Sequence, residues 1–257
     1  MVGLLLVIAL WLFSCGGSRD SSGEQELRLS VNTTWYIQLQ GEIDTNKDVE
    51  LYDIDLFDVS EDTVRLLKSR GKIVICYFNA GAYENWRPDK DRFPADAIGK
   101  PLEGWEGERW LDVRRREVRE IMLGRLRLAK EKGCDGVDPD NVNGYENDTG
   151  FNITYEDQLD YNLFLSREAH RLSLLIGLKN DGNQVLDLVD SFDFSVQEEC
   201  HQYNECHLYY PFVERGKPVF NIEYERIDNL CSRAESEGFM TAIYNLELDG
   251  STFIPCW

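Results

Sequence analysis

Short apolar runs recur along the chain, and each one ends on polar residues. Runs of this length, rich in β-branched and aromatic side chains, are typical of buried strands. The pattern predicts eight strands, at residues 35–40, 51–56, 72–78, 136–141, 174–178, 192–196, 218–222 and 239–243.

Segments with the apolar spacing of an amphipathic helix separate most of these strands. The clearest is residues 113–132, where apolar side chains lie among arginine and glutamate until Gly133 ends the segment. Ser60 is expected to cap one further helix and Thr154 to open another, because their hydroxyl groups can accept from free backbone N–H groups. We therefore expect helices also at residues 60–68, 158–173, 183–190 and 226–237.

One long stretch, residues 82–111, follows neither pattern. It holds Trp86, Trp105 and Trp110 together with prolines and many charges. An irregular insertion of this length inside a compact domain is usually functional or forms a lid. We expect it to be structureless and to serve the function of the protein.

The alternation of strands and helices indicates a parallel sheet with helical crossovers. Eight such units in about 220 residues is what a (β/α)₈ TIM barrel requires. We therefore expect a single α/β domain of this kind over residues 34–257 of the 257-residue chain. A doubly wound open sheet is the alternative, but the first strand lacks the Gly-x-Gly-x-x-Gly turn of a dinucleotide-binding fold.

Residues 1–15 are apolar and carry no charge. This run is shorter than the roughly 20 apolar residues that span a membrane, so it predicts a signal peptide and no transmembrane span in the mature protein. Residues 12–17 also loosely resemble a bacterial lipobox with Cys15 as the lipidated residue, and plain cleavage is the alternative. The polar residues 16–33 are expected to form a flexible tether. We expect a secreted, extracellular protein, either free or lipid-anchored at Cys15.

The formal net charge of −20 argues against some classes of binding partner. Nucleic acids and anionic membranes bind patches of lysine and arginine, so neither is an expected partner. An acidic surface suits a secreted protein or one that binds a cationic molecule. A monomer is expected.

Six cysteines follow Cys15, and an even number in an exported protein fits disulfides. Cys200 and Cys206 bracket a short loop and are the best candidate pair, and a bond between Cys231 and Cys256 is a conjecture. The chain has only three histidines and no Cys-x-x-Cys, which disfavours a zinc site. No metal and no cofactor is expected.

The residues after Val137 are the most informative polar strand end. Asp138, Asp140 and Asn141 follow directly on an apolar strand. Unpaired carboxylates inside a core cost several kcal/mol, so this tip is expected at the mouth of a pocket. An ordinary turn is the alternative, because Asp, Asn and Pro favour turns.

The other predicted strands end in the same way. Their polar ends are, in order, Gln38 or Gln40, Asp53 or Asp55, Asn79, Asp138 with Asp140, Lys179 with Asn180, Glu198 with Glu199, Glu223, and Asn245. Active sites of (β/α)₈ barrels lie at these strand ends, so we expect a ring of polar side chains around one pocket. Nearby aromatic residues, Tyr36, Tyr77, Tyr83, Trp86, Tyr224 and Tyr244, could stack on a sugar ring whose hydroxyls or amines the carboxylates hold.

Cleavage of a glycosidic bond needs two carboxyl groups of opposite protonation. The candidates are Asp138 or Asp140 on the fourth strand and Glu198 or Glu199 on the sixth. Groups on separate strands can face each other across a sugar. The same acids could instead hold a divalent cation, although the spacing of an EF-hand is absent.

Six motifs together are specific, although each alone is weak. They are residues 74–84 (VICYFNAGAYE), 104–105 with 110–112 (GW, WLD), 136–145 (GVDPDNVNGY), 177–181 (GLKND), 198–200 with 203–206 (EEC, YNEC), and 223–224 (EY). On these motifs the chain resembles glycoside hydrolase family 114, the endo-α-1,4-polygalactosaminidase-like proteins. Asn143 stands where Asp is common, and Asp138 where Glu also occurs.

The resemblance implies a (β/α)₈ barrel that cleaves an α-1,4-linked polysaccharide of galactosamine or N-acetylgalactosamine. By analogy with retaining α-glycosidases of similar layout, Asp140 is expected as the nucleophile and Glu198 as the acid/base, with Glu199 as the substitute for that second role. The residues expected to bind the substrate are Tyr36, Gln38, Asp55, Tyr77, Asn79, Asp138, Asn141, Lys179, Asn180, Glu223 and Tyr224.

Two other functions remain open at this point. A carbohydrate-binding barrel without catalysis would keep the pocket and show no turnover. A metal-dependent hydrolase of another substrate would lose its activity in the presence of a chelator.

Overall fold

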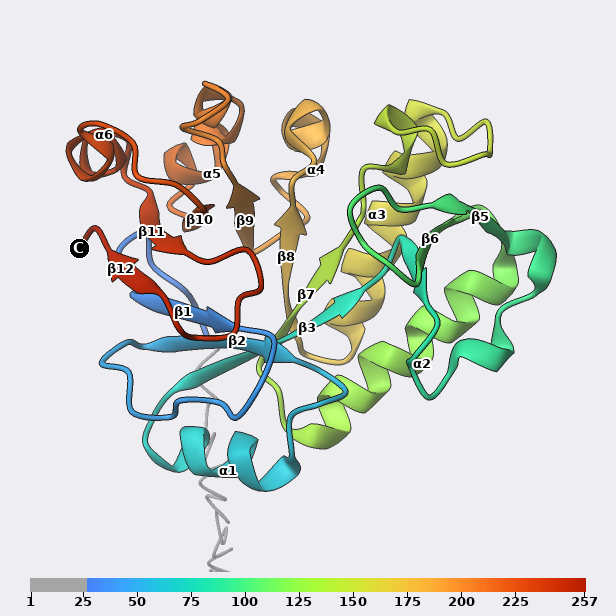
Figure 1. The fold of residues 1–257 in the computed structure, drawn as a ribbon, viewed down its shortest axis with the longest axis horizontal. Coiled ribbons are helices and arrows are strands. Elements are labelled where there is room, and N and C mark those ends of the chain that lie inside the picture. Colours follow the sequence, from blue (N-terminus) through green and yellow to red (C-terminus); the bar gives the residue numbers. More distant parts are fainter. Residues whose placement is uncertain (1–26) are drawn as a thin grey trace, which may run out of the picture.

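Eight parallel strands form a nearly closed barrel in the computed structural model, which describes residues 27–257 (Figure 1). They are β1 (Trp35–Gln38), β2 (Leu51–Asp55), β3 (Ile73–Asn79), β7 (Gly136–Asp140), β8 (Leu175–Lys179), β9 (Phe194–Glu198), β10 (Val219–Glu223) and β11 (Met240–Tyr244). They are neighbours in this order, and β12 (Phe253–Pro255) adds antiparallel to β11. The predicted barrel and all eight predicted strands are confirmed.

Side chains and single hydrogen bonds join β1 to the last strands, and no ladder between them occurs in residues 27–257. The indole N–H of Trp35 donates to the carbonyl oxygen of Met240 at 2.8 Å. The Leu39 N–H donates to the carbonyl oxygen of Leu248 at 2.8 Å. The ring of Phe253 meets that of Tyr36 edge-on, with 5.0 Å between centroids. The barrel therefore closes through aromatic packing.

Helices cover the outside of the barrel between most strands (Figure 1). They are α1 (Glu61–Ser69), α2 (Arg116–Lys132), α3 (Tyr155–Arg171), α4 (Val185–Leu188), α5 (Tyr210–Glu214) and α6 (Leu230–Glu237). Short 3₁₀ turns are η1 (Lys90–Arg92), η2 (Ala95–Ala97), η3 (Gly144–Glu146), η4 (Gly182–Gln184) and η5 (Cys206–Tyr209).

The predicted caps are confirmed, and two predicted helix starts are too early. Ser60 accepts from the Thr63 N–H, and Thr154 forms a capping box with Asp157. Helix α2 starts at Arg116 because the preceding Arg115 has an extended backbone. Helix α6 starts at Leu230 because Asn229 adopts a left-handed conformation, with φ at 58°.

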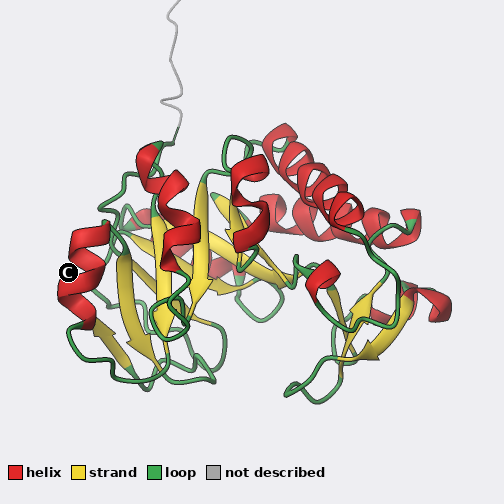
Figure 2. Ribbon diagram, turned by 90° about the horizontal axis from the view of Figure 1, so that it is seen from above, coloured by secondary structure: helices red, strands yellow, loops and turns green. Residues whose placement is uncertain are grey.

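The insertion is ordered, so the expectation of a structureless stretch is wrong. Strands β4 (Ala82–Glu84), β6 (Glu108–Leu111) and β5 (Ile98–Pro101) form an antiparallel sheet in that order. Figure 2 shows this sheet as a lobe beside the barrel. The lobe lacked an apolar signature because few of its residues are buried, and Trp110 and Leu111 of β6 are among those that are.

Two buried arginines fasten the insertion to the barrel. Arg87 forms ion pairs with Asp55 of β2 at 2.5 Å and with Glu84 of β4 at 2.7 Å. Arg125 of α2 pairs with Asp89 at 2.9 Å and donates to the carbonyl oxygen of Asn79 at 2.6 Å. Buried ion pairs are strongly destabilising when one partner is removed, so these contacts hold the lobe in one position.

Three disulfides link Cys76 to Cys134, Cys200 to Cys206, and Cys231 to Cys256. Both pairs named from the sequence are confirmed. The bond from Cys76 joins β3 to Cys134, which lies two residues before β7 begins.

The predicted signal peptide, Cys15 and residues 16–26 of the predicted tether lie outside the described residues. In residues 27–33, Leu29 packs against the core and Thr33 is buried. Among the helices of the described part, none combines the length and apolar character needed to cross a bilayer.

Candidate active site

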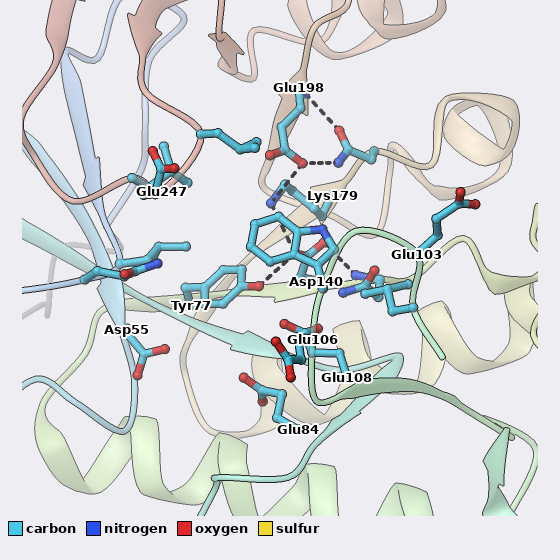
Figure 3. A pocket seen from close by; sticks show the side chains of 18 of the residues that line it. Asp55, Tyr77, Glu84, Glu103, Glu106, Glu108, Asp140, Lys179, Glu198 and Glu247 are labelled. Atoms are coloured by element: carbon cyan, nitrogen blue, oxygen red, sulfur yellow. Dashed lines mark hydrogen bonds and ion pairs between the residues drawn. The ribbon is translucent and has the colours of Figure 1, made fainter. Parts of the chain in front are cut away.

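A cavity of about 650 Å³ opens at the carboxyl ends of the barrel strands, between them and the insertion. Figure 3 shows acidic side chains entering it from both sides. The strand-end residues that line it include Asp55, Tyr77, Asp140, Lys179 and Glu198. The predicted pocket at the strand ends is therefore present.

Asp140, the last residue of β7, is held by two donors. The Tyr77 hydroxyl donates to its Oδ2 at 2.8 Å, and the backbone N–H of Asn141 donates to its Oδ1 at 2.6 Å. Burial, together with the charge of Asp140, raises the pKa of Tyr77 well above its ordinary value, so Tyr77 stays a neutral donor. The carboxylate of Asp140 is thereby fixed in position at the pocket floor.

Glu198, the last residue of β9, has a matching pair of donors. The side-chain amide of Asn180 donates to its Oε2 at 2.5 Å, and the Tyr224 hydroxyl donates to its Oε1. Asn180 also accepts from the backbone N–H of Glu198 at 2.9 Å. Burial and the neighbouring Glu198 raise the pKa of Tyr224, which keeps this hydroxyl protonated as well.

Lys179 lies between the two carboxyl groups. Its Nζ is 3.5 Å from Asp140 Oδ2 and 3.5 Å from Glu198 Oε2 (Figure 3). These two oxygens are therefore at most twice that distance, about 7 Å, apart. Burial disfavours the charge of Lys179, but attraction to Asp140 and Glu198 outweighs it and raises the pKa of Lys179.

Each of these three strands is followed at once by a left-handed residue that is not glycine. Asn141, Asn180 and Glu199 have φ values of 58°, 51° and 58°. Such residues are uncommon, store strain and cluster at functional sites. The turn they make ends each strand directly after its pocket-facing side chain. Glu198 lines the pocket and Glu199 does not, which distinguishes the two neighbours that the sequence could not separate.

Acidic residues of the insertion form the opposite wall, and sequence reasoning missed them as site residues. Glu108 accepts from the Asn79 side-chain amide at 2.8 Å. Burial, with the charges of Glu84 and Asp140 nearby, raises the pKa of Glu108 to about 8. The only signal was the run of glutamates around Trp105 in the sequence.

The pocket is strongly acidic as a whole. Nine carboxyl groups line it, those of Asp55, Asp58, Glu84, Glu103, Glu106, Glu108, Asp140, Glu198 and Glu247. Among its described lining residues the cations are Arg87 and Lys179, and both are already paired with carboxylates.

Comparison with known proteins identifies the family. A model of glycoside-hydrolase family GH114 matches residues 18–256. The chain belongs to glycoside hydrolase family 114. It is therefore a glycoside hydrolase, and the resemblance seen in the motifs is confirmed. A search of the curated proteins finds no match.

Solved structures agree with this family. Ega3 of Aspergillus fumigatus, crystallised in complex with galactosamine, is 44% identical with a TM-score of 0.83, covering 87% of this chain and 95% of that chain. The glycoside hydrolase domain of PelA from Pseudomonas aeruginosa is 13% identical with a TM-score of 0.68, covering 85% of this chain and 96% of that chain. At this lower identity PelA supports the fold alone.

Of the residues expected to bind substrate in this family-114 hydrolase, six line the pocket. They are Asp55, Tyr77, Asn141, Lys179, Asn180 and Tyr224. Asp55 binds Arg87 and accepts from the N–H groups of Phe57 and Asp58, so its carboxylate is occupied in holding the insertion.

The structure places Tyr36, Gln38, Asn79 and Asp138 outside the pocket lining. The Tyr36 hydroxyl donates to Gln38 at 3.0 Å, and the amide of Gln38 donates to three backbone carbonyls of the surrounding loops. The side-chain amide of Asn79 donates to Glu108, and its oxygen accepts from the Ala82 N–H. Asp138 is fully buried below the pocket floor. These four side chains lie behind the pocket lining, and those of Tyr36, Gln38 and Asn79 make hydrogen bonds to other groups of the protein there.

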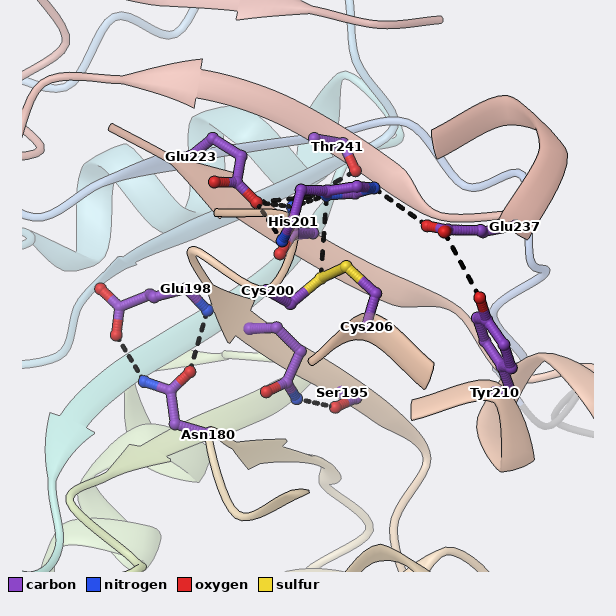
Figure 4. Close-up of a disulfide and its surroundings, with 12 residues drawn as sticks. Asn180, Ser195, Glu198, Cys200, His201, Cys206, Tyr210, Glu223, Glu237 and Thr241 are labelled. Atoms are coloured by element: carbon purple, nitrogen blue, oxygen red, sulfur yellow. Dashed lines mark hydrogen bonds and ion pairs between the residues drawn. A yellow bond between two sulfur atoms is a disulfide. The ribbon is translucent and has the colours of Figure 1, made fainter. Parts of the chain in front are cut away.

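Glu223 also lies outside the pocket lining, buried against His201 (Figure 4). Its Oε1 accepts from the His201 backbone N–H at 2.9 Å and lies 3.1 Å from the Nδ1 of that ring. The other ring nitrogen, Nε2, is 2.9 Å from Glu237 of α6. Glu223 therefore joins β10 to the loop after β9.

One group of described residues has the spacing of metal ligands, namely Cys200, His201 and Cys206. Its two sulfurs are joined in a disulfide, so neither is available as the thiolate that zinc binds.

Gly81 tests how tightly the site is built. A Cβ at this position would lie 1.7 Å from the carbonyl oxygen of Asn141, and the Gly81 N–H donates to that of Asp140. We predict that Gly81→Ala displaces Asp140 and lowers kcat by about 100-fold, because a shift of an ångström near the reacting atoms can cost that much. Steady-state kinetics with far-UV circular dichroism would measure this.

Gly124→Ala is the matched control, because that glycine lies within α2 and its added methyl meets only the end of Arg92. It should keep wild-type kcat. Wild-type activity in Gly81→Ala would show that the approach of the two loops does not position Asp140.

Glu223→Gln tests the placement of Glu223 away from the substrate. Disturbing the buried hydrogen bonds of Glu223 should lower the free energy of unfolding by about 1 to 3 kcal/mol. Because Glu223 does not line the pocket, KM should stay within about twofold of wild type. Denaturant titration and steady-state kinetics give the two values. Glu247→Gln, a change at the pocket wall, is the control and should leave the free energy of unfolding unchanged. A raised KM in Glu223→Gln, with that control unchanged, would show that Glu223 contacts the substrate.

Proposed function

We propose that this glycoside hydrolase cleaves α-1,4-linked galactosamine polysaccharide, with Asp140 as nucleophile and Glu198 as acid/base. The observation that carries the proposal is the pair of carboxyl groups on β7 and β9, both within 3.5 Å of Lys179 at the pocket floor. Each group also accepts hydrogen bonds from two donors of its own, which fix its position.

The proposed reaction has two steps. In the first, Glu198 gives its proton to the leaving glycosidic oxygen while Asp140 bonds to the anomeric carbon. In the second, Glu198 takes a proton from water, which attacks the same carbon and releases Asp140. Tyr77 and the Asn141 N–H stabilise Asp140 as the departing carboxylate. Tyr224 and Asn180 keep Glu198 oriented through both steps.

The acidic pocket supports a substrate that carries free amines. An ammonium group on each sugar would be attracted by the insertion wall, where Glu103 and Glu106 lie. The complex of Ega3 with galactosamine supports the same sugar. Trp86 and Trp105, which are 50% and 46% exposed, line the pocket and offer flat faces to sugar C–H groups. We therefore propose the de-N-acetylated polymer ahead of the N-acetylated one.

We also propose that the enzyme acts outside the cell. Three disulfides among the described residues support an oxidising compartment. The proposed signal peptide at residues 1–15, with or without a lipid on Cys15, would deliver it there.

The decisive experiment measures reducing-end release from de-N-acetylated and N-acetylated α-1,4-galactosamine polymers. Asp140→Asn and Glu198→Gln should each lower kcat by at least about 10³-fold while the fold is kept, because each removes a group that the bond cleavage needs. Asn143→Asp, a pocket-lining change of charge away from the pair, serves as control. Activity within tenfold of wild type in either variant would exclude that residue from catalysis. A chelator should leave the activity unchanged.

Salt dependence separates the two polymers. Raising sodium chloride from about 50 mM to about 500 mM should lower kcat/KM for the free-amine polymer at least about tenfold, because salt screens its attraction to the pocket. The N-acetylated polymer is uncharged and should respond little. Equal responses would remove the electrostatic argument for the free amine.

A further inference from the structure

Glu108 brings a carboxyl group from the insertion into the pocket. It lies on β6, directly opposite Glu84 of β4 in their antiparallel pair. Side chains directly opposite each other in such a pair lie on the same face of the sheet. Both carboxyl groups therefore point to one side of the insertion, and both line the pocket (Figure 3).

A hydrogen bond holds the Glu108 carboxyl group beside the proposed nucleophile. The Asn79 side-chain amide donates to Glu108 Oε2 at 2.8 Å, and the Ala82 N–H donates to Asn79 Oδ1 at 2.7 Å, which fixes this amide. Asn79 ends β3, and in the ladder between β3 and β7 it is the partner of Asp140. Neighbouring strands lie about 4.8 Å apart, so Glu108 is bound to the residue next to Asp140.

Glu108 lacks the counter-ion that its neighbours have. Glu84 pairs with Arg87 at 2.7 Å, and Asp140 pairs with Lys179 at 3.5 Å. Within residues 27–257, no lysine, arginine or histidine forms an ion pair with Glu108, and the Asn79 amide is its one hydrogen-bond donor. Because Glu108 lines the pocket, its other oxygen, Oε1, is open to a ligand.

The surrounding charges disfavour an ionised Glu108 in the empty pocket. Burial, followed by the charges of Glu84 and Asp140, raises the pKa of Glu108 to about 8. Arg87 opposes this rise, but its guanidinium is already paired with Glu84. Tyr77, the titratable neighbour on β3, is a neutral phenol. The empty enzyme therefore carries a proton on Glu108 at neutral pH.

An amino sugar places a cation where this carboxyl group lies. The amine of galactosamine is on C2, the carbon bonded to the anomeric carbon that Asp140 attacks in the proposed reaction. A carboxylate that binds this ammonium must therefore lie beside the nucleophile. Glu108 meets this condition. Glu103 and Glu106 are exposed, which suits the attraction of the polymer from a distance.

We propose that Glu108 is the specificity-determining residue of the pocket: it binds the C2 ammonium of the sugar whose bond is cleaved, and this binding displaces the proton that Glu108 holds in the empty enzyme. The proton passes to the solvent, and an ion pair replaces the neutral acid. This role rests on the proposed function, because it assumes that Asp140 reacts with an amino sugar. An N-acetylated sugar is uncharged and would leave the proton on Glu108.

Calorimetric titration of the enzyme with galactosamine tests this exchange. At about pH 6.5 the sugar amine is already protonated, so a released proton comes from the protein. Titrations in buffers of different ionisation enthalpy should give about one proton released per sugar bound. Because the proton must leave for the sugar to bind, the affinity should rise about tenfold from about pH 6 to about pH 7. N-acetylgalactosamine should release no proton.

Glu108→Gln removes the titrating group and keeps an oxygen that can accept from Asn79. This variant should release no proton and should bind galactosamine at least about tenfold more weakly, with no rise between the two pH values, because a charged hydrogen bond is lost. Glu131→Gln is the matched control, since Glu131 is exposed on α2 and lies outside the pocket lining. It should match wild type throughout, and thermal unfolding monitors the fold of both variants.

Three outcomes would count against one of the two proposals. Galactosamine binding without proton release, or with the same release in Glu108→Gln, would overturn the role of Glu108 and leave the cleavage reaction standing. Equal losses of affinity for galactosamine and N-acetylgalactosamine in Glu108→Gln would show that Glu108 binds a hydroxyl group instead, which also contradicts the role. Proton release by wild type without cleavage of any galactosamine polymer would contradict the proposed function alone.

Discussion

The site depends on the ion pairs that the ammonium group of Lys179 makes with the carboxyl groups around it. This ammonium is a buried cation on β8 whose nearest charged neighbours are Asp140 on β7 and Glu198 on β9, with Asp138 beneath them. Three carboxyl groups could not be gathered in this small buried volume without a cation, because their mutual repulsion and the cost of removing them from water would push them apart. The lysine therefore makes the carboxyl pair possible, and the pair in turn keeps the lysine charged. The position of the three strands relative to one another is fixed by the parallel ladder, so the three side chains meet without any further adjustment.

Backbone strain and close approach maintain this geometry at the strand ends. Left-handed residues follow Asp140, Lys179 and Glu198, and each turns the chain away as soon as the functional side chain has been presented. Gly81 lets the end of β3 come against the end of β7, where hydrogen bonds to the Asp140 carbonyl join the two. The insertion brings a second set of acids to the same pocket, and the buried Arg87 and Arg125 hold it there. The result is an acidic pocket whose two walls are fixed relative to each other.

Much of this arrangement could be predicted from the sequence, because buried parallel strands leave continuous apolar runs and their polar ends are easy to see. Asp140, Lys179, Asn180 and Glu198 were found in this way. The insertion was not, because its strands are only three or four residues long and carry no apolar periodicity. The acids at Glu84 and Glu108 went unnoticed with it. Glu223 ends a strand as Glu198 does, but a histidine distant from it in sequence, His201, turns it into a structural partner. Periodicity reports which residues end a strand. It does not report which of them a neighbouring loop will bind.

The most direct test of the account is to identify the residue that bonds to the sugar. Glu198→Gln enzyme would be incubated with an α-galactosaminyl fluoride, whose leaving group needs no protonation, and then digested for peptide mass spectrometry. Without the base that activates water, the intermediate should accumulate. The account predicts one added galactosamine on the peptide that contains Asp140. A sugar attached to another carboxyl group, or turnover to the inverted product with no labelled peptide, would contradict it.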